Sequence, residues 1–494
     1  MRLTIFLSLL AVSASAAVTV APLFSDHAVL QRNRPVPVWG RADPAEKIKA
    51  TFQGQAVATV ADAQGRWVVT FPPLATAKDG ADLVIEGENT VTLHDVVVGE
   101  VWLCSGQSNM GFDLSRAANA ATEIPLSANP LLREIIINDS AQAAPSETAK
   151  ASKWEIAGPQ TSGRFTAVGY FFGKELAQKI GVPVGLIKST VGGTPVEAWM
   201  SAEAFASDSA FAGIAERSRA EDRSFADLRL KAWRQAEAGA MTSGAEAHAA
   251  FLKATPAPAV YPPKLPMVLF NGKIAPLKPY AFRGVIWYQG EANAARPREY
   301  HRLFAAMITD WRRYFAQGDF PFYWVQLPNF AAGDPAGTKW AELREAQTQT
   351  LSLPNTGQAL AIDVGDAKNL HPTNKVPVGH RLALIAARDV YGFKDEANGP
   401  AFRSAERAGR EFTITFEHAA GLNAHGGEVL AVEMSGPDRV FHPAQARIVG
   451  DRLVVSSTAV AEPVAVRYAW TNAPDAKLYN GAGLPAVPFR SDSW

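Results

Sequence analysis

The feature that most constrains the fold is an alternation of strand and helix patterns between residues 97 and 398. Apolar runs typical of strands lie at 100–104, 184–187, 284–288, 322–327 and 359–364. Between and after them, apolar residues recur at helical spacing at 164–180, 299–315, 339–351 and in a stretch that begins at Pro377 and ends at Gly392. Such alternation predicts a parallel sheet covered by helices. Because these sheets bind ligands at the carboxyl ends of their strands, the polar loops that follow each strand are the first candidates for a site.

The chain on either side of this segment has a different pattern. Residues 17–96 and 399–494 contain short apolar runs separated by glycine, proline and aspartate turns, which predicts a β-sandwich-like region at each end. Residues 201–260 interrupt the alternation with an alanine-rich, charged stretch that predicts a helical insertion. This insertion either flanks the mouth of the site or is a solvent-exposed excursion.

The first sixteen residues are typical of a signal peptide. Arg2 precedes a short apolar run, and Ala14-Ser15-Ala16 is a small-residue cleavage site. We therefore expect the mature protein to begin near Ala17 and to be periplasmic or secreted. No later stretch reaches the roughly 20 apolar residues of a membrane span, so none is expected.

Composition excludes some classes of partner. The chain has 48 Lys and Arg against 48 Asp and Glu, so its formal net charge is zero and no overall field attracts nucleic acid. The single cysteine, Cys104, cannot form an internal disulfide and is expected to be buried. These features do not determine the oligomeric state.

Ser108 is the candidate nucleophile. It follows the strand at 100–104 and comes two residues after Gly106. A sharp turn at a strand end lifts a hydroxyl out of the sheet, and glycine permits such a turn. A serine in such a turn can equally cap the next helix, so the motif alone leaves both roles open.

Three further polar loops follow predicted strands. His371, after 359–364, is the candidate general base, although a loop histidine can also be structural. Gly193 follows 184–187 and Gln289 follows 284–288. A glycine N–H and a side-chain amide are the kinds of donor that stabilise an oxyanion. Four polar loops at the same edge of a parallel sheet predict one shared site.

Four blocks of the sequence resemble those of sialate O-acetylesterases and related carbohydrate esterases, which are SGNH (GDSL-like) hydrolases. The blocks occupy 102–110, 192–200, 287–293 and 371–375 in the family's order, with further similarity at 340–347 and 478–480. The resemblance covers nearly the whole mature chain. It implies an SGNH-hydrolase-like three-layer α/β/α domain over 97–398, an acetylated carbohydrate substrate and no metal or organic cofactor.

The resemblance also implies roles for individual residues. Ser108 would be the nucleophile and His371 the general base, and an acetyl-enzyme would form and be hydrolysed by water. The backbone N–H groups of Ser108 and Gly193, with the Gln289 side chain, would form the oxyanion hole.

The third member of the triad is where the chain departs from the family pattern. Relatives commonly have an aspartate two or three residues before the histidine, but these positions hold Asn369 and Lys368. We expect either that Asn369 orients His371 through its side chain or carbonyl, or that Asp366 takes this role.

Side chains near these blocks are candidates for substrate binding. Aromatic faces suit the apolar side of a sugar ring, although core packing is the alternative for each aromatic residue. Arg344 either binds a sugar carboxylate or forms an ion pair on a helix surface. The predicted set is Asn109, Trp199, Tyr288, Glu291, Asn293, Trp340 and Arg344.

The sequence therefore predicts a carbohydrate O-acetylesterase acting on sialate O-acetyl esters or on acetylated xylan and other hemicelluloses. Two alternatives stay open. One is a non-catalytic glycan-binding protein on the same fold. The other is a glycoside hydrolase that uses Glu197 and Glu291 as paired carboxylates, which would leave the serine and glycine blocks without a purpose.

Overall fold

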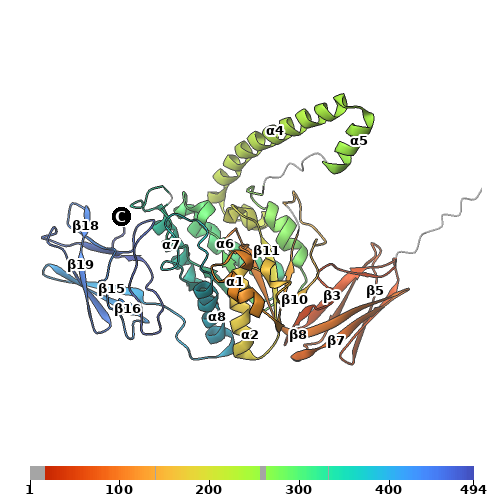
Figure 1. Cartoon of the computed structure of the whole chain (residues 1–494), viewed down its shortest axis with the longest axis horizontal. Helices are drawn as coiled ribbons and strands as arrows, with labels where there is room; N and C mark the ends of the chain where they lie inside the picture. The colour runs from red at the N-terminus through yellow and green to blue at the C-terminus, as the bar shows by residue number, and fades with distance from the viewer. Residues whose placement is uncertain (1–16, 139–140, 256–262, 332) are drawn as a thin grey trace, which may run out of the picture.

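The computed structural model describes residues 17–138, 141–255, 263–331 and 333–494. The predicted signal peptide, residues 1–16, lies outside the described residues. Figure 1 shows a central α/β body with N-terminal strands at one end and C-terminal strands at the other. Among the described helices, none is long and apolar enough to cross a membrane.

The central body contains the predicted parallel sheet. Its strands run in the order β10-β9-β11-β8-β12-β13-β14, and all neighbours are parallel except β10 and β9. The antiparallel edge strand makes the sheet mixed. The bounds are β8 Thr90–Gly106, β9 Asn129–Ile136, β10 Glu155–Ala157, β11 Val184–Thr190, β12 Gly284–Tyr288, β13 Phe322–Val325 and β14 Thr356–Ala359.

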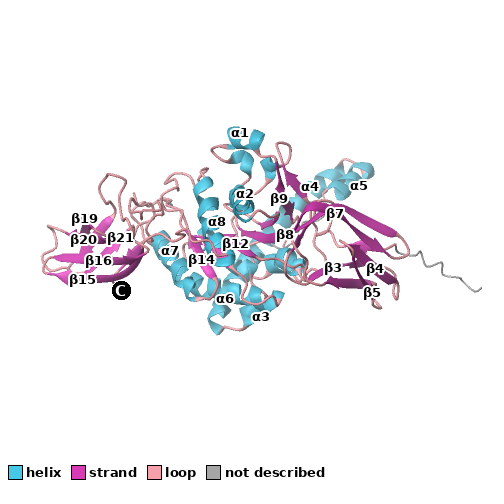
Figure 2. Ribbon diagram, turned by 90° about the horizontal axis from the view of Figure 1, so that it is seen from below, coloured by secondary structure: helices cyan, strands magenta, loops and turns pink. Residues whose placement is uncertain are grey.

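Helices cover both faces of this sheet, which gives three layers (Figure 2). Side chains alternate along a strand. Trp102 and Cys104 of β8 therefore pack in the core shared with α2 and α8, whereas Val101 and Leu103 pack in the core shared with α6 and α7. Burial on both faces explains why residues 101–104 of β8 are all apolar. The helices are α2 Ala167–Ile180, α6 Pro297–Phe315, α7 Lys339–Gln349 and α8 Val376–Tyr391.

Local signals set the ends of the predicted helices. The Thr166 hydroxyl accepts from the N–H of Gly169 and caps the start of α2, and Gly181 ends it with φ 65°. The last predicted strand, 359–364, is displaced, because β14 ends at Ala359. Beyond it the Val364 N–H donates to the Ala361 carbonyl in a turn, and the apolar side chains there are buried by packing outside the sheet.

β8 is shared between the N-terminal region and the central body. Its first half pairs with β2 (Val29–Gln31) and β7 (Ala77–Glu86), and its second half pairs with β11 and β12. The predicted boundary at residue 96 thus falls within one continuous strand. The other N-terminal strands are β1 Thr19–Val20, β3 Val36–Arg41, β4 Lys47–Phe52, β5 Gln55–Val60 and β6 Arg66–Phe71.

The C-terminal region consists of two four-stranded sheets that share a separate core. One contains β15 Ala401–Ala408, β16 Glu411–Glu417, β20 Arg452–Ser456 and β19 Gln445–Val449; the other contains β18 Phe441–Pro443, β17 Val432–Ser435, β21 Ala465–Tyr468 and β22 Phe489–Arg490.

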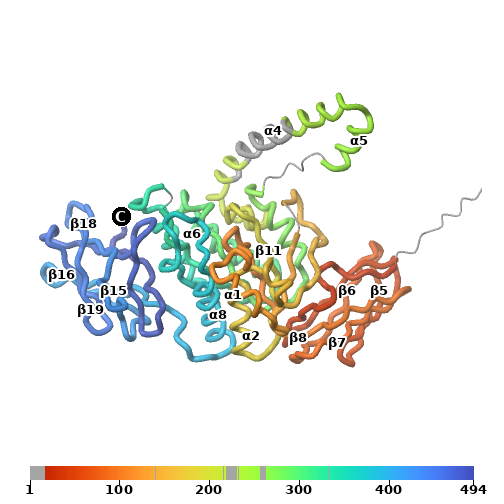
Figure 3. Tube along the Cα trace, in the orientation of Figure 1, coloured from red at the N-terminus to blue at the C-terminus, as the bar shows by residue number. Residues whose placement is uncertain are grey.

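The stretch predicted as a helical insertion contains α3 (Ala202–Ala206), α4 (Ala212–Thr242) and α5 (Ala245–Ala254). The α4–α5 hairpin projects away from the three layers (Figure 3). A short helix, α1 (Ala120–Glu123), follows β8.

Candidate active site

Ser108 lies in the turn that follows β8 at the carboxyl edge of the parallel sheet. Gly106 ends the strand with φ 130°, and a Cβ built there would lie 2.3 Å from the Tyr288 carbonyl oxygen of β12. Only glycine fits this approach. The N–H groups of Met110 and Gly111 donate to the Gln107 carbonyl and close the turn that presents Ser108.

His371 reaches Ser108 from the loop between β14 and α8. Its Nε2 lies 2.7 Å from Ser108 Oγ, although the two residues are 263 apart in sequence. A general base must lie within about 2.6–3.2 Å of the proton it takes, so this pair has the geometry for proton transfer.

Neither predicted orienting residue contacts the His371 ring. The Asn369 Oδ1 accepts from the backbone N–H of His371 at 2.9 Å, and Asp366 Oδ1 accepts from the Lys368 N–H at 2.8 Å. Within the described residues, no side chain or carbonyl accepts from Nδ1 of the ring. The predictions that Asn369 or Asp366 orients the imidazole directly are therefore corrected: Asn369 fixes the backbone of His371, and Asp366 stabilises its own turn.

The Gly193 turn lies beside the serine. A Cβ built on Gly192 would lie 3.4 Å from Ser108 Cβ, and Gly193 has a positive φ of 69°. In the part of the chain that the structure describes, the backbone N–H groups of Ser108 and Gly193 donate to no acceptor. They are available to an oxyanion.

The Gln289 amide is engaged elsewhere. Its Nε2 donates to the Thr194 carbonyl at 3.1 Å and to Asn293 Oδ1 at 2.7 Å, which uses both of its hydrogens. In this structure Gln289 therefore anchors the loop that carries Gly193, and its predicted role as an oxyanion donor stays a prediction.

Asn109 connects three loops of the site and is fully buried. Its Nδ2 donates to Glu291 Oε1 at 2.6 Å and to the Leu370 carbonyl at 3.0 Å, and its Oδ1 accepts from Lys375 Nζ at 2.6 Å. These bonds hold the serine turn against the loops of Glu291 and His371. The structure thus gives Asn109 a positioning geometry, and its predicted contact with substrate stays a prediction.

Burial and neighbouring charges perturb the titration of the site. Desolvation, then the positive charges of Lys375 and Arg116, lower the pKa of His371 below its usual value. Burial lowers the pKa of Lys375 to about 7, and burial raises the pKa of Glu291. A lowered pKa keeps His371 neutral, as a general base must be.

Four predicted substrate contacts are buried. Trp199, Tyr288 and Arg344 are 0% exposed and Asn293 is 1% exposed, so none offers a surface to a ligand. The Arg344 guanidinium donates to the backbone carbonyls of Ala469, Thr471 and Asn472 of the C-terminal region. In this structure these four side chains contribute to packing, and their contacts with substrate stay predictions.

A cleft beside the serine turn retains the other two predicted residues. It has a volume of about 460 Å³, and Gly193, Glu291, Phe330, Trp340 and Leu370 are among its lining residues. Glu291 Oε2 has no hydrogen-bond partner within the described residues. Phe330 packs against Trp340 with ring centroids 5.4 Å apart. The sequence did not single out Phe330, because a lone aromatic residue in a loop carries no periodic signal.

Charged groups also line this cleft. Arg296 donates to Glu197 at 2.8 Å, and Arg217 at the start of α4 contributes as well. The insertion therefore reaches the mouth of the cleft at its first turns. No cluster of three or more potential metal-ligating side chains occurs among the described residues.

Three comparisons place the chain among known proteins. The family model described as carbohydrate esterase, sialic acid-specific acetylesterase, matches residues 98–255 and 270–388. The sialate O-acetylesterase of Mus musculus is 28% identical over 528 residues, which cover 97% of this chain and 95% of that protein. The enzyme of Homo sapiens is 27% identical over 509 residues, covering 92% and 88%.

A solved structure has the same overall architecture. The crystal structure of a carbohydrate acetylesterase from Xanthomonas citri has a TM-score of 0.83 and 38% sequence identity, and the match covers 97% of this chain and all of that one, at 100%. This likeness extends from the N-terminal strands through the central body to the C-terminal sheets. The chain belongs to the sialic acid-specific acetylesterase family of carbohydrate esterases and is a carboxylic-ester hydrolase.

Proposed function

We propose that this chain removes acetyl groups from sugar hydroxyls through a serine acetyl-enzyme. The observation that carries the proposal is the 2.7 Å separation between Ser108 Oγ and His371 Nε2, with the Gly192–Gly193 turn beside it. A nucleophile, a base and two free backbone donors are what acyl transfer requires.

In the proposed reaction, neutral His371 takes the Ser108 proton as Oγ attacks the acetyl carbonyl carbon. The N–H groups of Ser108 and Gly193 donate to the carbonyl oxygen as it gains negative charge. The intermediate collapses, and His371 returns the proton to the departing sugar oxygen. Water, deprotonated by His371, then attacks the acetyl carbon of the acetyl-enzyme. The bond from that carbon to Ser108 Oγ breaks, His371 returns the proton to Oγ, and acetate leaves.

The site would operate as a Ser-His dyad. No carboxylate contacts the imidazole among the described residues, so Asn369 supports the base only through the backbone. The oxyanion donors and the positioning of the substrate then supply most of the catalysis.

The cleft is suited to a sugar. Phe330 and the exposed edge of Trp340 line it with aromatic surface that suits the apolar face of a ring, and Arg296 and Glu197 line it with charged groups that suit hydroxyls. The relatives are named for sialate esters, whereas the solved neighbour is described only as a carbohydrate acetylesterase. We include acetylated sialic acids and acetylated hemicelluloses as substrate classes, and we propose a periplasmic or secreted location.

Acetate release tests the proposal. Wild type should release acetate from O-acetylated sialic acid or from acetylated xylo-oligosaccharides. Ser108→Ala and His371→Ala should each lower kcat/KM roughly 10³-fold or more. His380→Ala is the matched control, because His380 is exposed on α8 and bonds Glu175.

Two outcomes would contradict this reading. Equal activity of Ser108→Ala and wild type would exclude the serine mechanism. A wild type that binds these glycans but hydrolyses no acetyl ester would instead be a glycan-binding protein.

A further inference from the structure

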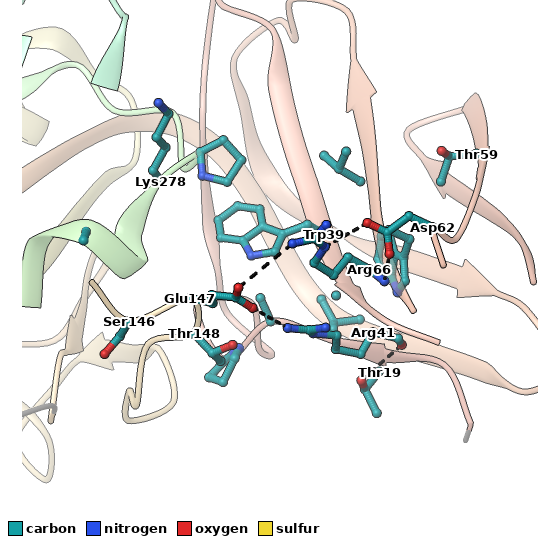
Figure 4. A pocket seen from close by; sticks show the side chains of 18 of the residues that line it. Thr19, Trp39, Arg41, Thr59, Asp62, Arg66, Ser146, Glu147, Thr148 and Lys278 are labelled. Carbon is teal, nitrogen blue, oxygen red and sulfur yellow. Dashed lines mark hydrogen bonds and ion pairs between the residues drawn. The ribbon is translucent and has the colours of Figure 1, made fainter. Parts of the chain in front are cut away.

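A second hollow lies between the N-terminal strands and the central body, away from Ser108 (Figure 4). Its volume is about 890 Å³, within the range of about 300–1,000 Å³ that is typical of ligand pockets. Helix α6 runs from one hollow to the other: Arg296, just before its first turn, lines the cleft, and Tyr314, near its end, lines this groove. At a rise of 1.5 Å per residue, these two residues lie about 27 Å apart along the helix.

One wall of the groove is the outer face of β3 and β6. In their antiparallel register Trp39 lies opposite Val68, and Arg41 lies opposite Arg66. Because side chains alternate along strands, these four share one face of the sheet. The solvent face of an antiparallel sheet is normally polar. Here Val68 is 48% exposed, and Val60 of β5, which also lines the groove, is 55% exposed.

Ion pairs form the rim above this apolar wall (Figure 4). Arg41 donates to Glu147 at 2.8 Å, Arg66 donates to Asp62 at 2.8 Å, and Arg66 lies 4.0 Å from Glu147. Lys278 adds one positive charge on the opposite side. Paired guanidinium and carboxylate groups keep further donors and lone pairs for hydroxyls, and their charges largely cancel.

We propose that this groove binds neutral sugar units of the glycan whose acetyl ester is cleaved at Ser108, an inference that rests on the proposed function. The C–H face of a sugar ring would contact Trp39 and Val68. Its hydroxyls would exchange hydrogen bonds with the Arg41–Glu147 pair.

The chemistry of the groove disfavours other ligands. Among the described residues that line the groove, a polyanion would meet only one cation without a carboxylate partner, Lys278, because Arg41 and Arg66 are paired. An aliphatic chain would remove water from the four charged side chains Arg41, Glu147, Arg66 and Asp62. A glycan long enough to bridge about 27 Å would raise the effective concentration of its esters at the cleft. The groove therefore affects polymeric substrates and leaves small acetyl esters unaffected.

Binding of unacetylated oligosaccharides tests the groove without turnover. Calorimetry with xylohexaose, cellohexaose and mannohexaose should show saturable binding of at least one of them to wild type. Val68→Asp should weaken it at least tenfold. Val449→Asp is the matched control, because Val449 is also 48% exposed and lies on a strand of the C-terminal sheet. Val68→Asp should also raise KM for polymeric acetylxylan, with kcat/KM for p-nitrophenyl acetate unchanged within twofold.

A second variant separates a loss of binding from a loss of folding. Arg41→Ala changes an exposed side chain and should weaken binding about fivefold, with an unchanged unfolding midpoint. Wild-type affinity in both variants, or no binding of any of the three oligosaccharides to wild type, would overturn the proposal. Val68-dependent binding without acetate release from any glycan would refute the proposed esterase function alone.

Discussion

Asn109→Ala is the substitution that most directly tests how the three active-site loops are held together. The Asn109 side chain forms hydrogen bonds to Glu291 at 2.6 Å, to the Leu370 carbonyl at 3.0 Å and to Lys375 at 2.6 Å. Alanine removes all three bonds in a fully buried position.

The size of the effect follows from the partners. A hydrogen bond to a charged group contributes about 1.5–3 kcal/mol, and two of the three partners are ionisable. The pKa of Lys375 is lowered to about 7 and that of Glu291 is raised, so both can lose their charge when Asn109 is absent. The lower end of the range therefore applies, and we expect the free energy of unfolding to fall by about 3 kcal/mol.

Activity should fall as well, because Asn109 adjoins Ser108 and bonds the residue before His371. A displacement of about 1 Å between reacting groups costs on the order of 10²-fold, so kcat/KM should fall ten- to hundredfold. Asn480→Ala is the control. Asn480 is 2% exposed and donates to the Asn398 and His418 carbonyls in the C-terminal region. It should lose stability but keep the kcat/KM of wild type.

Urea unfolding and p-nitrophenyl acetate hydrolysis measure the two effects. The reasoning would be refuted if Asn109→Ala kept kcat/KM within threefold and lost less than about 1 kcal/mol. It would also be refuted if Asn480→Ala lost as much activity as Asn109→Ala.

Three further predictions follow from the site. Lys375→Met removes a positive charge that lowers the pKa of His371, so that pKa should rise. The acid limb of the profile of kcat/KM against pH should then move to higher pH. A limb that stays in place or moves to lower pH would contradict the role of His371 as the base. Asn369→Ala and Asp366→Ala should each lower kcat/KM less than tenfold (about 1.4 kcal/mol), since neither side chain contacts the His371 ring. A loss above hundredfold for Asp366→Ala would show that Asp366 acts on the imidazole. Arg344→Ala should lower the free energy of unfolding by about 3 kcal/mol or more, because it removes buried hydrogen bonds to backbone carbonyls. The ratio of kcat/KM between sialate and xylan esters should stay the same. A loss of activity on sialate esters alone would show that Arg344 contacts the substrate.

The predicted end of the helix at 164–180 was accurate, because Gly181 ends it through backbone groups within one turn. Its start lies at Ala167, three residues later than predicted, because Thr166 caps it there. β14 was displaced because an apolar run such as 359–364 has the same pattern whether a strand or neighbouring segments bury it. Periodicity records that a side chain is buried but does not identify the element that buries it.

For several residues of the site, too, the sequence could not show whether the side chain is buried or faces the cleft. An aromatic side chain serves equally well in a core or under a sugar, so only packing could show that Trp199 and Tyr288 lie wholly in the core whereas Trp340, itself 5% exposed, is among the residues that line the cleft. An amide has two hydrogens, and only its surroundings decide whether they remain free. For Gln289, Thr194 and Asn293 take both.

The sequence by itself determined the order of strands and helices, the polar loops that meet at one edge of the sheet and the resemblance to the carbohydrate esterases. Only the tertiary structure decided which side chains touch. The bond from His371 to Ser108 joins residues 263 apart, and no local pattern encodes such a distance. The sequence alone shows that Asn369 and Lys368, and no carboxylate, precede His371 by two and three residues. Only the structure shows that no carboxylate from another described segment reaches the ring, because hydrogen bonds form within about 3 Å, a scale that the packing of separate segments sets.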